Sequence, residues 1–367
     1  MLFGIFVFWV FAIYFRNLPL TPPNGVNFPG DTPTYVDSVH FIETGISTPN
    51  FLPNRLLTNF AYLRLLILFD KFRILYLGWI VLNSLFYIFS GFIFYKIVNR
   101  IFGSDKVAAF GTALFLGNYV SITFGLHYLT DIGSVMFYLA AANFTLEYIK
   151  TGDIKSAYFA ASMAGVGGLF KEYALGGFIM VALAILYRAK YKNEKFLRPI
   201  CLAAFISFTP IVLVQISVFL QYHYSYLNWV RYVSGTPSVS YKSKVVEHLK
   251  AMFYMFNTGY LLFFYSLYLL RKNYTKYFSS EVKIFLGIFL LSALPILVYP
   301  GITERLDFIF APFLILVSCV AVKEHEMQHK FWLFFLVIYL LVTFSMDTYI
   351  LQPEWKVALM LSLKKII

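Results

Sequence analysis

The sequence predicts an all-α membrane protein with about eleven spanning helices, and three observations lead to that fold class. Of the 367 residues, 60% are hydrophobic and 13% are charged, against roughly 45–50% and 25% in a soluble domain. Apolar runs such as 74–95, 199–222 and 331–346 approach the roughly 20 residues that a helix needs to cross a bilayer. Strand-like alternation is absent, which excludes an outer-membrane barrel. No polar stretch is long enough for a soluble domain, so we expect one transmembrane domain over 1–367.

We expect each span to be an apolar run bounded by polar residues. The eleven runs are 2–15, 74–95, 107–126, 132–149, 156–170, 173–187, 199–222, 251–270, 282–299, 307–322 and 331–346. The loops that then lie inside are 96–106, 150–155, 188–198, 271–283 and 323–330, and these 49 residues hold 16 of the 30 Lys and Arg. By the positive-inside rule the N-terminus is inside and the C-terminus outside. Most of the net charge of +12 is therefore an orientation signal, and no nucleic-acid partner is predicted.

Two ambiguous segments are settled by length and by the same charge bias. The run 56–69 has 14 residues and contains Arg64, so a helix there rises only about 21 Å and is expected to lie on the outer face. The run 156–187 is interrupted by Lys171 and Glu172. One crossing there would put a basic loop outside, so two short helices hinged at Lys171 are predicted. The first span has no basic residue before it, which leaves open whether the N-terminus is complete.

Ionisable residues gather at or just beyond the outer helix ends. They are Asp31, Asp37, Arg55, Asp131, Lys171, Glu172, Arg231, Glu304, Arg305 and Asp307. Charged groups at membrane depth are costly and mark a pathway or a site. A transporter is expected to carry them near the bilayer midplane on interrupted helices. Their position at the helix ends therefore favours an outward-facing site at the membrane interface.

The outer loop 16–73 carries the strongest single signal. Thr32 suits a helix N-cap and Pro33 the first helical position, and apolar residues follow at helical spacing over 35–42. This predicts an amphipathic surface helix, with Asp31 at its positive end and held as a carboxylate. Asp31 is then a candidate general base or hydroxyl-orienting group. An equal alternative is that it only completes the capping turn.

The other candidates also have structural readings. Asp131 can cap the helix that it opens, which taken alone is its more frequent role. Lys171 and Glu172 can equally form a pair with each other. Arg305, flanked by acidic residues, fits either a structural ion pair or a phosphate ligand. The histidines lack metal-ligand spacing and no nucleotide, zinc-protease or serine-hydrolase motif is present, so no metal site is predicted.

Four motifs, in this order and on one side, resemble the C-type (GT-C) integral-membrane glycosyltransferases. That class contains protein O-mannosyltransferases, aminoarabinose transferases and catalytic subunits of oligosaccharyltransferases. The motifs are Gly30-Asp31 with Tyr35, Pro53-Asn54-Arg55-Leu56-Leu57, Leu129-Thr130-Asp131 and Gly168-Leu169-Phe170-Lys171-Glu172, all within about the first 190 residues. The resemblance implies a GT-C fold and inverting transfer of one hexosyl or pentosyl unit. The donor would be a polyprenyl- or dolichyl-phosphate sugar and the acceptor a hydroxyl at the extracytoplasmic face.

Carried over residue by residue, the resemblance makes Asp31 the catalytic carboxylate and Asp131 the acidic residue of the second loop. It makes Lys171 and Arg305 candidate ligands of the donor phosphate. This sequence departs from the class because many members pair two acids in the first loop, whereas Asp31 stands alone until Asp37. No large soluble outer domain is present, which favours single-sugar over en bloc transfer. No cofactor is predicted, and a divalent metal requirement is left open.

The implied localisation is multi-pass, in a plasma membrane or, in a eukaryote, the endoplasmic reticulum membrane, with the active site extracytoplasmic or lumenal. The implied partners are the lipid-linked donor and membrane lipids. The sugar, the acceptor and the oligomeric state are left open. Two alternatives to the transferase remain: a lipid or solute transporter or flippase, and a non-catalytic membrane subunit whose outer charges are structural pairs.

Overall fold

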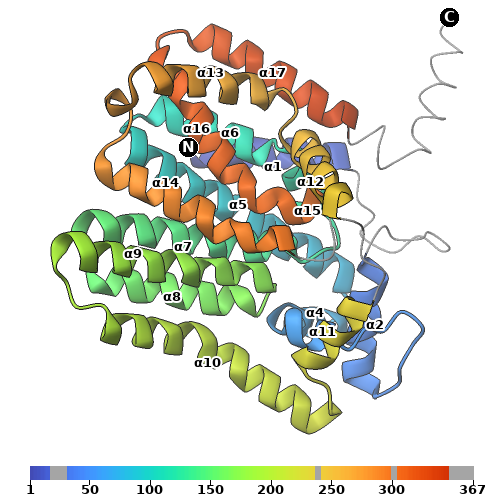
Figure 1. The fold of residues 1–367 in the computed structure, drawn as a ribbon. Helices are drawn as coiled ribbons and strands as arrows, with labels where there is room; N and C mark the ends of the chain where they lie inside the picture. The colour runs from blue at the N-terminus through green and yellow to red at the C-terminus, as the bar shows by residue number, and fades with distance from the viewer. Residues whose placement is uncertain (17–30, 236–240, 299–303, 347–367) are drawn as a thin grey trace, which may run out of the picture.

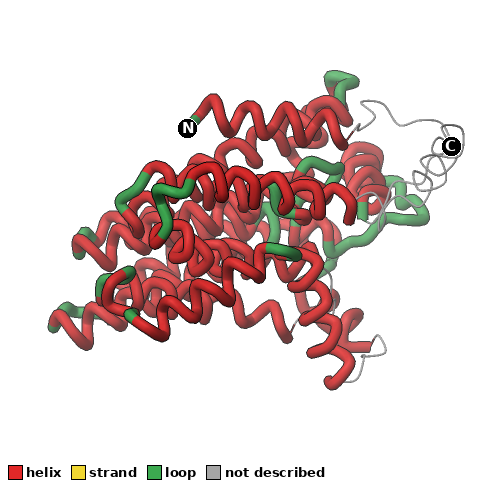
Figure 2. Tube along the Cα trace, turned by 90° about the horizontal axis from the view of Figure 1, so that it is seen from above, coloured by secondary structure: helices red, strands yellow, loops and turns green. Residues whose placement is uncertain are grey.

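The computed structural model describes residues 1–16, 31–235, 241–298 and 304–346. Over these ranges the chain consists of helices and loops without a strand (Figure 2), as the sequence predicts. The helices of the first half are α1 (Leu2–Arg16), α2 (Thr32–Thr44), α3 (Arg55–Thr58), α4 (Phe60–Lys71), α5 (Leu75–Phe102), α6 (Asp105–Leu116), the π-helix η1 (Ser121–Gly125), α7 (Asp131–Thr151), α8 (Ile154–Gly168), the 3₁₀-helix η2 (Glu172–Leu175) and α9 (Gly176–Lys192).

The second half continues with helices of 3 to 26 residues. They are α10 (Leu197–Tyr222), α11 (Tyr226–Gly235), α12 (Tyr241–Phe256), α13 (Gly259–Lys272), the 3₁₀-helix η3 (Tyr274–Lys276), α14 (Ser280–Ala293), η4 (Leu294–Val298), α15 (Glu304–Asp307), η5 (Phe308–Phe310), α16 (Ala311–Glu324) and α17 (His329–Met346). Each of the eleven predicted apolar runs overlaps a helix, although the run 107–126 is divided between α6 and η1 and the run 251–270 between α12 and α13.

Seven helical stretches in the described residues are long and apolar enough to cross a membrane. They are Leu75–Phe102, Asp131–Thr151, Glu172–Lys192, Leu197–Tyr222, Ser280–Leu297, Arg305–Glu324 and His329–Met346. The four remaining predicted spans fall on shorter helices, α1, α6, α8 and the α12–α13 pair. The count of about eleven crossings therefore stays a prediction.

Two interruptions between helices can be compared with the predicted boundaries of the spans. The break at Lys171 is confirmed, since α8 ends at Gly168 and α9 begins only at Gly176. The continuous span expected over 251–270 is wrong, because α12 and α13 are separated at Asn257, which has φ 37°. Asn tolerates this left-handed backbone better than most residues. Its side-chain amide is held by Thr343 of α17 at 3.1 Å, which fixes the break.

The helices run side by side and gather their connections at two ends (Figure 1). One end, here called the basic end, holds the α5–α6, α7–α8, α9–α10, α13–α14 and α16–α17 turns. The opposite end, here called the loop end, holds α2, α4, α11, α12 and α15. Between them α7, α8 and α9 pack closely through small residues, because a Cβ on Gly177 would lie 2.8 Å from Cβ of Ala141 and 2.9 Å from that of Ala164.

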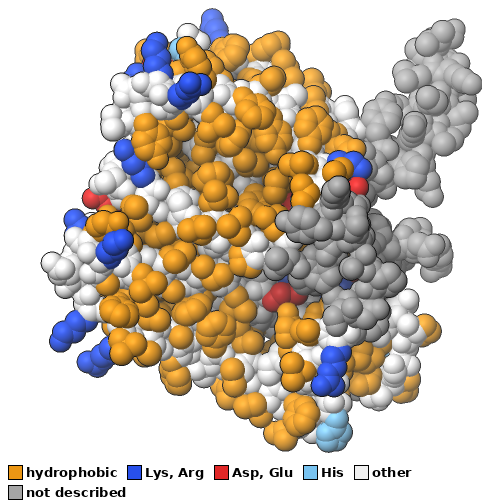
Figure 3. Space-filling model, in the orientation of Figure 1, with side chains coloured by type: hydrophobic (Ala, Val, Ile, Leu, Met, Phe, Trp, Pro, Cys, Tyr) orange, Lys and Arg blue, Asp and Glu red, His pale blue; other side chains and the backbone are white. Residues whose placement is uncertain are grey.

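The outside of the bundle is apolar. Figure 3 shows a broad hydrophobic face over the helices, with Lys and Arg side chains mainly at its borders. Only 17% of the apolar window of α10 and of α17 is buried within the bundle. A broad exposed apolar face such as this one indicates contact with lipid or with another protein.

Candidate functional site

Five charged side chains from distant parts of the sequence meet at the loop end, and we call them the charge cluster. Asp31 binds Arg55 through Oδ1 at 3.0 Å and Arg305 through Oδ2 at 2.7 Å. Asp131 binds Nζ of Lys171 through Oδ1 at 2.6 Å, and its Oδ2 lies 3.6 Å from Nε of Arg305. All five are residues that the sequence singles out, and the structure brings them into one chain of ion pairs.

The loop before α7 is fixed by buried hydrogen bonds, and this places Asp131. Trp79 Nε1 and Asn83 Nδ2, both on α5, donate to the carbonyl of Leu129 at 3.1 and 3.0 Å. Thr32, the first residue of α2, donates its hydroxyl to the carbonyl of Tyr128 at 2.9 Å. The start of α7 is therefore tied both to the neighbouring long helix and to the helix that follows Asp31.

A buried amide connects this loop to the one that carries Lys171. Asn59 is fully buried and its Nδ2 donates to Thr130 Oγ1 at 2.9 Å and to the carbonyl of Phe170 at 2.8 Å. The hydroxyl of Ser134 donates to the carbonyl of Lys171 at 2.9 Å. Asn59 is neutral and was not among the residues predicted from the sequence, although a side-chain amide inside an otherwise apolar run was an available signal. Thr130 was named only as part of the motif Leu129-Thr130-Asp131.

The two arginines that hold Asp31 differ in their free hydrogen-bonding capacity. Arg55 also donates Nε to Thr34 Oγ1 at 3.1 Å and Nη1 to the Tyr35 hydroxyl at 3.3 Å, and its guanidinium stacks 4.6 Å from the Tyr35 ring centre. Arg305, in contrast, makes no hydrogen bond through its buried Nε among the described residues, and that atom lies 3.6 Å from Oδ2 of Asp131. Arg55 thus divides its donors between Asp31, Thr34 and Tyr35, whereas Nε of Arg305 is not committed to a hydrogen bond.

The arginines also set the ionisation of Asp31. Burial alone would raise its pKa, but the positive charges of Arg55 and Arg305 outweigh burial and lower the pKa to about 2. Asp31 is therefore a carboxylate throughout the neutral range. Within the charge cluster three cations face two carboxylates, and the nearby carboxylate of Glu172 balances the third cation.

The structure shows which partners the candidate residues have, where the sequence leaves alternatives open. The N-cap of α2 is Asp31, not Thr32, and its side chain makes no capping hydrogen bond. Asp131 is the first residue of α7 and does not cap it either. Lys171 pairs with Asp131 rather than with its neighbour Glu172. Arg305 pairs with distant carboxylates, while Asp307, two residues on, binds His248.

The remaining candidate residues, Glu172, Asp37 and Arg231, differ in how close they lie to the charge cluster. The carboxylate of Glu172 lies close enough to the charge cluster to act on the charge of Arg55, and its buried Oε2 has no hydrogen-bond partner in the part of the chain described. Asp37 instead accepts the backbone N–H of Asn50 at 3.0 Å, in the exposed turn after α2. Arg231 lies on α11 with its side chain exposed. Nowhere in the described ranges are three or more His, Cys, Asp or Glu side chains placed to hold a metal ion.

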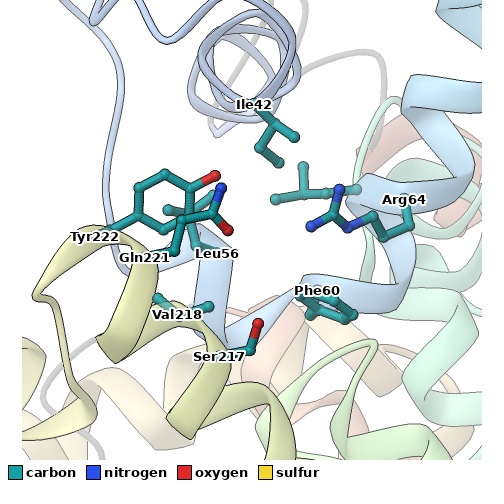
Figure 4. A pocket seen from close by; sticks show the side chains of 9 residues that line it. Ile42, Leu56, Phe60, Arg64, Ser217, Val218, Gln221 and Tyr222 are labelled. Carbon is teal, nitrogen blue, oxygen red and sulfur yellow. The ribbon is translucent and has the colours of Figure 1, made fainter.

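A small pocket marks the joint between the loop-end helices and α10 (Figure 4). It is lined by Ile42, Leu56, Phe60, Leu63, Arg64, Ser217, Val218, Gln221 and Tyr222. Water-sized occupants have about 10 Å³ of space there, which is room for about one water molecule. A sugar does not fit, so this pocket is not a substrate site in this conformation.

Comparison with known proteins supports the fold and not the sequence family. Neither the protein-family models nor the curated proteins contain a match to this chain. Among solved structures the chain is similar to ArnT from Cupriavidus metallidurans, whose crystal structure has undecaprenyl phosphate bound. The TM-score is 0.58 at 15% identity, over 89% of this chain and 60% of that chain.

This chain thus spans 60% of the length of ArnT, and identity at that level carries information on fold alone. The GT-C resemblance drawn from the motifs is confirmed as a likeness of fold. With seven apolar helices of spanning length, the chain is an integral membrane protein with the fold of a GT-C glycosyltransferase.

Proposed function

We propose that the chain transfers a single sugar from a polyprenyl-phosphate donor to an acceptor hydroxyl, with its active site at the charge cluster. The observation that carries this proposal is the meeting of three largely buried cations, two of which, Lys171 and Arg305, share the carboxylate of Asp131. A polyprenyl-phosphate sugar is a phosphodiester and has one negative charge. Its binding would bring that charge to Lys171 and Arg305, which can donate charge-assisted hydrogen bonds to it.

Arg305 and Lys171 are the proposed ligands of the donor phosphate. Charge-assisted hydrogen bonds from both would hold the phosphate in place and stabilise the negative charge that it gains as the leaving group. Asp131 lies between them, 2.6 Å from Lys171 and 3.6 Å from Arg305, and so keeps the two cations on one side of the site.

Asp31 is better suited to orienting the acceptor than to taking its proton. A carboxylate with a pKa of about 2 is a weak base near neutral pH. Its negative charge can instead align the acceptor hydroxyl and stabilise the positive charge that develops at the sugar C1 during in-line, inverting attack. The unpartnered Oε2 of Glu172 would accept a hydrogen bond from a sugar hydroxyl.

We further propose that the loop end is extracytoplasmic and the basic end cytoplasmic, with about eleven crossings. The 21 residues of α7 run from the charge cluster to the basic end, and at 1.5 Å each they span about 31 Å, which matches a 30 Å hydrocarbon core. Cysteine labelling tests this after exposed Cys201 is replaced by Ser. A cysteine at Ile46 should label from outside and one at Asn193 from inside; the reverse would overturn the orientation.

The transferase proposal is tested with the purified chain and a polyprenyl-phosphate sugar. Asp31→Asn should lower transfer about 100- to 1,000-fold, as for other electrostatic groups in active sites, while undecaprenyl phosphate still binds. Asp37→Asn, which changes a half-buried acid on α2 outside the charge cluster, is the matched control and should be active. Wild-type turnover in Asp31→Asn would exclude this role. Movement of the lipid between leaflets without covalent change would identify a transporter or flippase instead, and neither activity would favour a non-catalytic subunit.

A further inference from the structure

A second side-chain pair lies beside the charge cluster and is not used by the proposed reaction. His248 of α12 is 6% exposed, and its Nδ1 lies 2.9 and 3.0 Å from the two carboxylate oxygens of Asp307, which is fully buried. Because an ionised carboxylate only accepts hydrogen bonds, Nδ1 is the donor. The pair links α12 to α15, which lie next to each other at the loop end (Figure 1).

The helix that this pair holds also carries Arg305. α15 (Glu304–Asp307) is the first turn of the helical stretch that continues through η5 and α16 to Glu324, and the end of a helix frays unless its side chains are held in place. Successive residues are rotated by about 100°, so side chains two positions apart leave a helix in nearly opposite directions. Arg305 therefore reaches Asp31 and Asp131 on one side while Asp307 reaches His248 on the other.

The chemistry of the histidine argues against a purely stabilising role. Its Nε2 is buried and has no hydrogen-bond partner in the described ranges. A buried polar atom left unpaired is destabilising, and an apolar residue of similar size would avoid that cost. What His248 provides and an apolar residue cannot is a donor at the Nδ1 position, which binds Asp307.

We propose that His248 is a positioning residue of the donor-phosphate site, which acts through Asp307 to hold α15 so that Arg305 reaches the charge cluster. The inference rests on the proposed function of Arg305 as a phosphate ligand. It assigns to α12 a role in donor binding although His248 itself need not touch the donor. It also predicts that the Nδ1 position matters and the Nε2 position does not.

Two amide substitutions separate the ring nitrogens. His248→Asn keeps a donor near the Nδ1 position, and His248→Gln keeps one near the Nε2 position. Binding of undecaprenyl phosphate to the purified full-length chain should weaken about tenfold in His248→Gln and stay within about twofold of wild type in His248→Asn. Lys250→Gln is the control, since it breaks the exposed Lys250–Glu247 pair on the same helix and should change nothing. Equal loss in both His248 variants, or no loss in either, would overturn the proposal.

A second measurement uses no donor, so its result can be interpreted even if the proposed transferase function is wrong. If His248 positions Arg305, the drop in melting temperature caused by Arg305→Ala should be smaller in a His248→Gln background than in the wild type. Additive drops would show that the His248–Asp307 pair and the charge cluster are independent, and would reject the positioning role. If undecaprenyl phosphate fails to bind the wild type while the drops are non-additive, the proposed donor is wrong and the positioning role stands.

Discussion

The two ends of α7 carry ion pairs built from the same kinds of residue, but the pairs differ in burial. Where α7 begins, at the loop end, Asp131 and Lys171 leave 3% and 6% of their side chains exposed. Near its last turn, at the basic end, Glu147 and Arg100 pair at 3.2 Å with 35% and 36% exposed. Burial, and not the presence of charge, distinguishes the two ends.

This difference separates two uses of charge in a membrane protein. At the basic end the charged side chains cap turns and join neighbouring helices in contact with solvent, which is sufficient to orient the chain. At the loop end Asp131 and Lys171 are almost fully withdrawn from solvent and the two arginines largely so, while Asp31 keeps 30% of its side chain exposed. A buried charge must be compensated by a partner. Such an arrangement is costly to build for stability alone, and it is therefore the end at which function is expected.

The largest expected effect is on stability, from removing one member of the most buried pair. Lys171→Met should cost about 3–5 kcal/mol of unfolding free energy, because it leaves the buried Asp131 carboxylate without its closest cation. Adding Asp131→Leu should recover most of that loss, since both charges are then gone. Thermal unfolding in detergent measures both variants. A double variant as unstable as the single would show that packing and not charge is lost.

Donor affinity should respond next most strongly, through Arg305. Charge-assisted hydrogen bonds contribute roughly 1.5–3 kcal/mol, so Arg305→Ala should weaken undecaprenyl phosphate binding about 10- to 100-fold. Arg305→Lys should lie between, because it keeps the charge and loses the planar fork. Arg64→Gln, an exposed cation on α4, is the matched control. Unchanged binding in Arg305→Ala, with a lowered melting temperature, would assign Arg305 to structure and leave Lys171 as the phosphate candidate.

Acid should destabilise the loop end selectively through Asp31. Its pKa is about 2 in the folded chain against 3.8 as the ordinary value, so its stabilising contribution is complete above about pH 4 and is lost as pH falls toward 2. The loss should amount to about 1–2 kcal/mol after allowance for partial exposure. Unfolding of wild type and Asp31→Asn across this window measures it. The variant should lack this component, and parallel pH profiles would contradict the assignment.

The sequence predicts the helices well, because apolar runs bounded by charge leave few other structures in a membrane. The hinge at Lys171 was predictable from length and charge bias. The break at Asn257 was not, since one Asn inside an apolar run is compatible with a helix. Its determinant is Thr343, which lies 86 positions away in the chain.

The members of the charge cluster were predictable, but their partners were not. Sequence proximity suggests that Lys171 pairs with Glu172 and that Arg305 pairs with Asp307. In the structure both cations instead bind carboxylates that are 40 and 274 positions distant. The neutral scaffold around them, such as Asn59, carries no charge signal and becomes visible only once its two loops are placed side by side.

The smallest effect on stability is expected from the exposed ion pair at the basic end. It is the reference against which the other effects are judged. Glu147→Gln removes the exposed ion pair with Arg100 but leaves Nη1 of Arg100 bound to Asn143 Oδ1 at 3.0 Å. Exposed pairs contribute below about 1 kcal/mol and are screened by salt. The melting temperature should therefore fall slightly at low ionic strength and match the wild type at high salt, with donor binding unaffected. A loss comparable to that of Lys171→Met would show that the two ends do not differ in the way that their burial indicates.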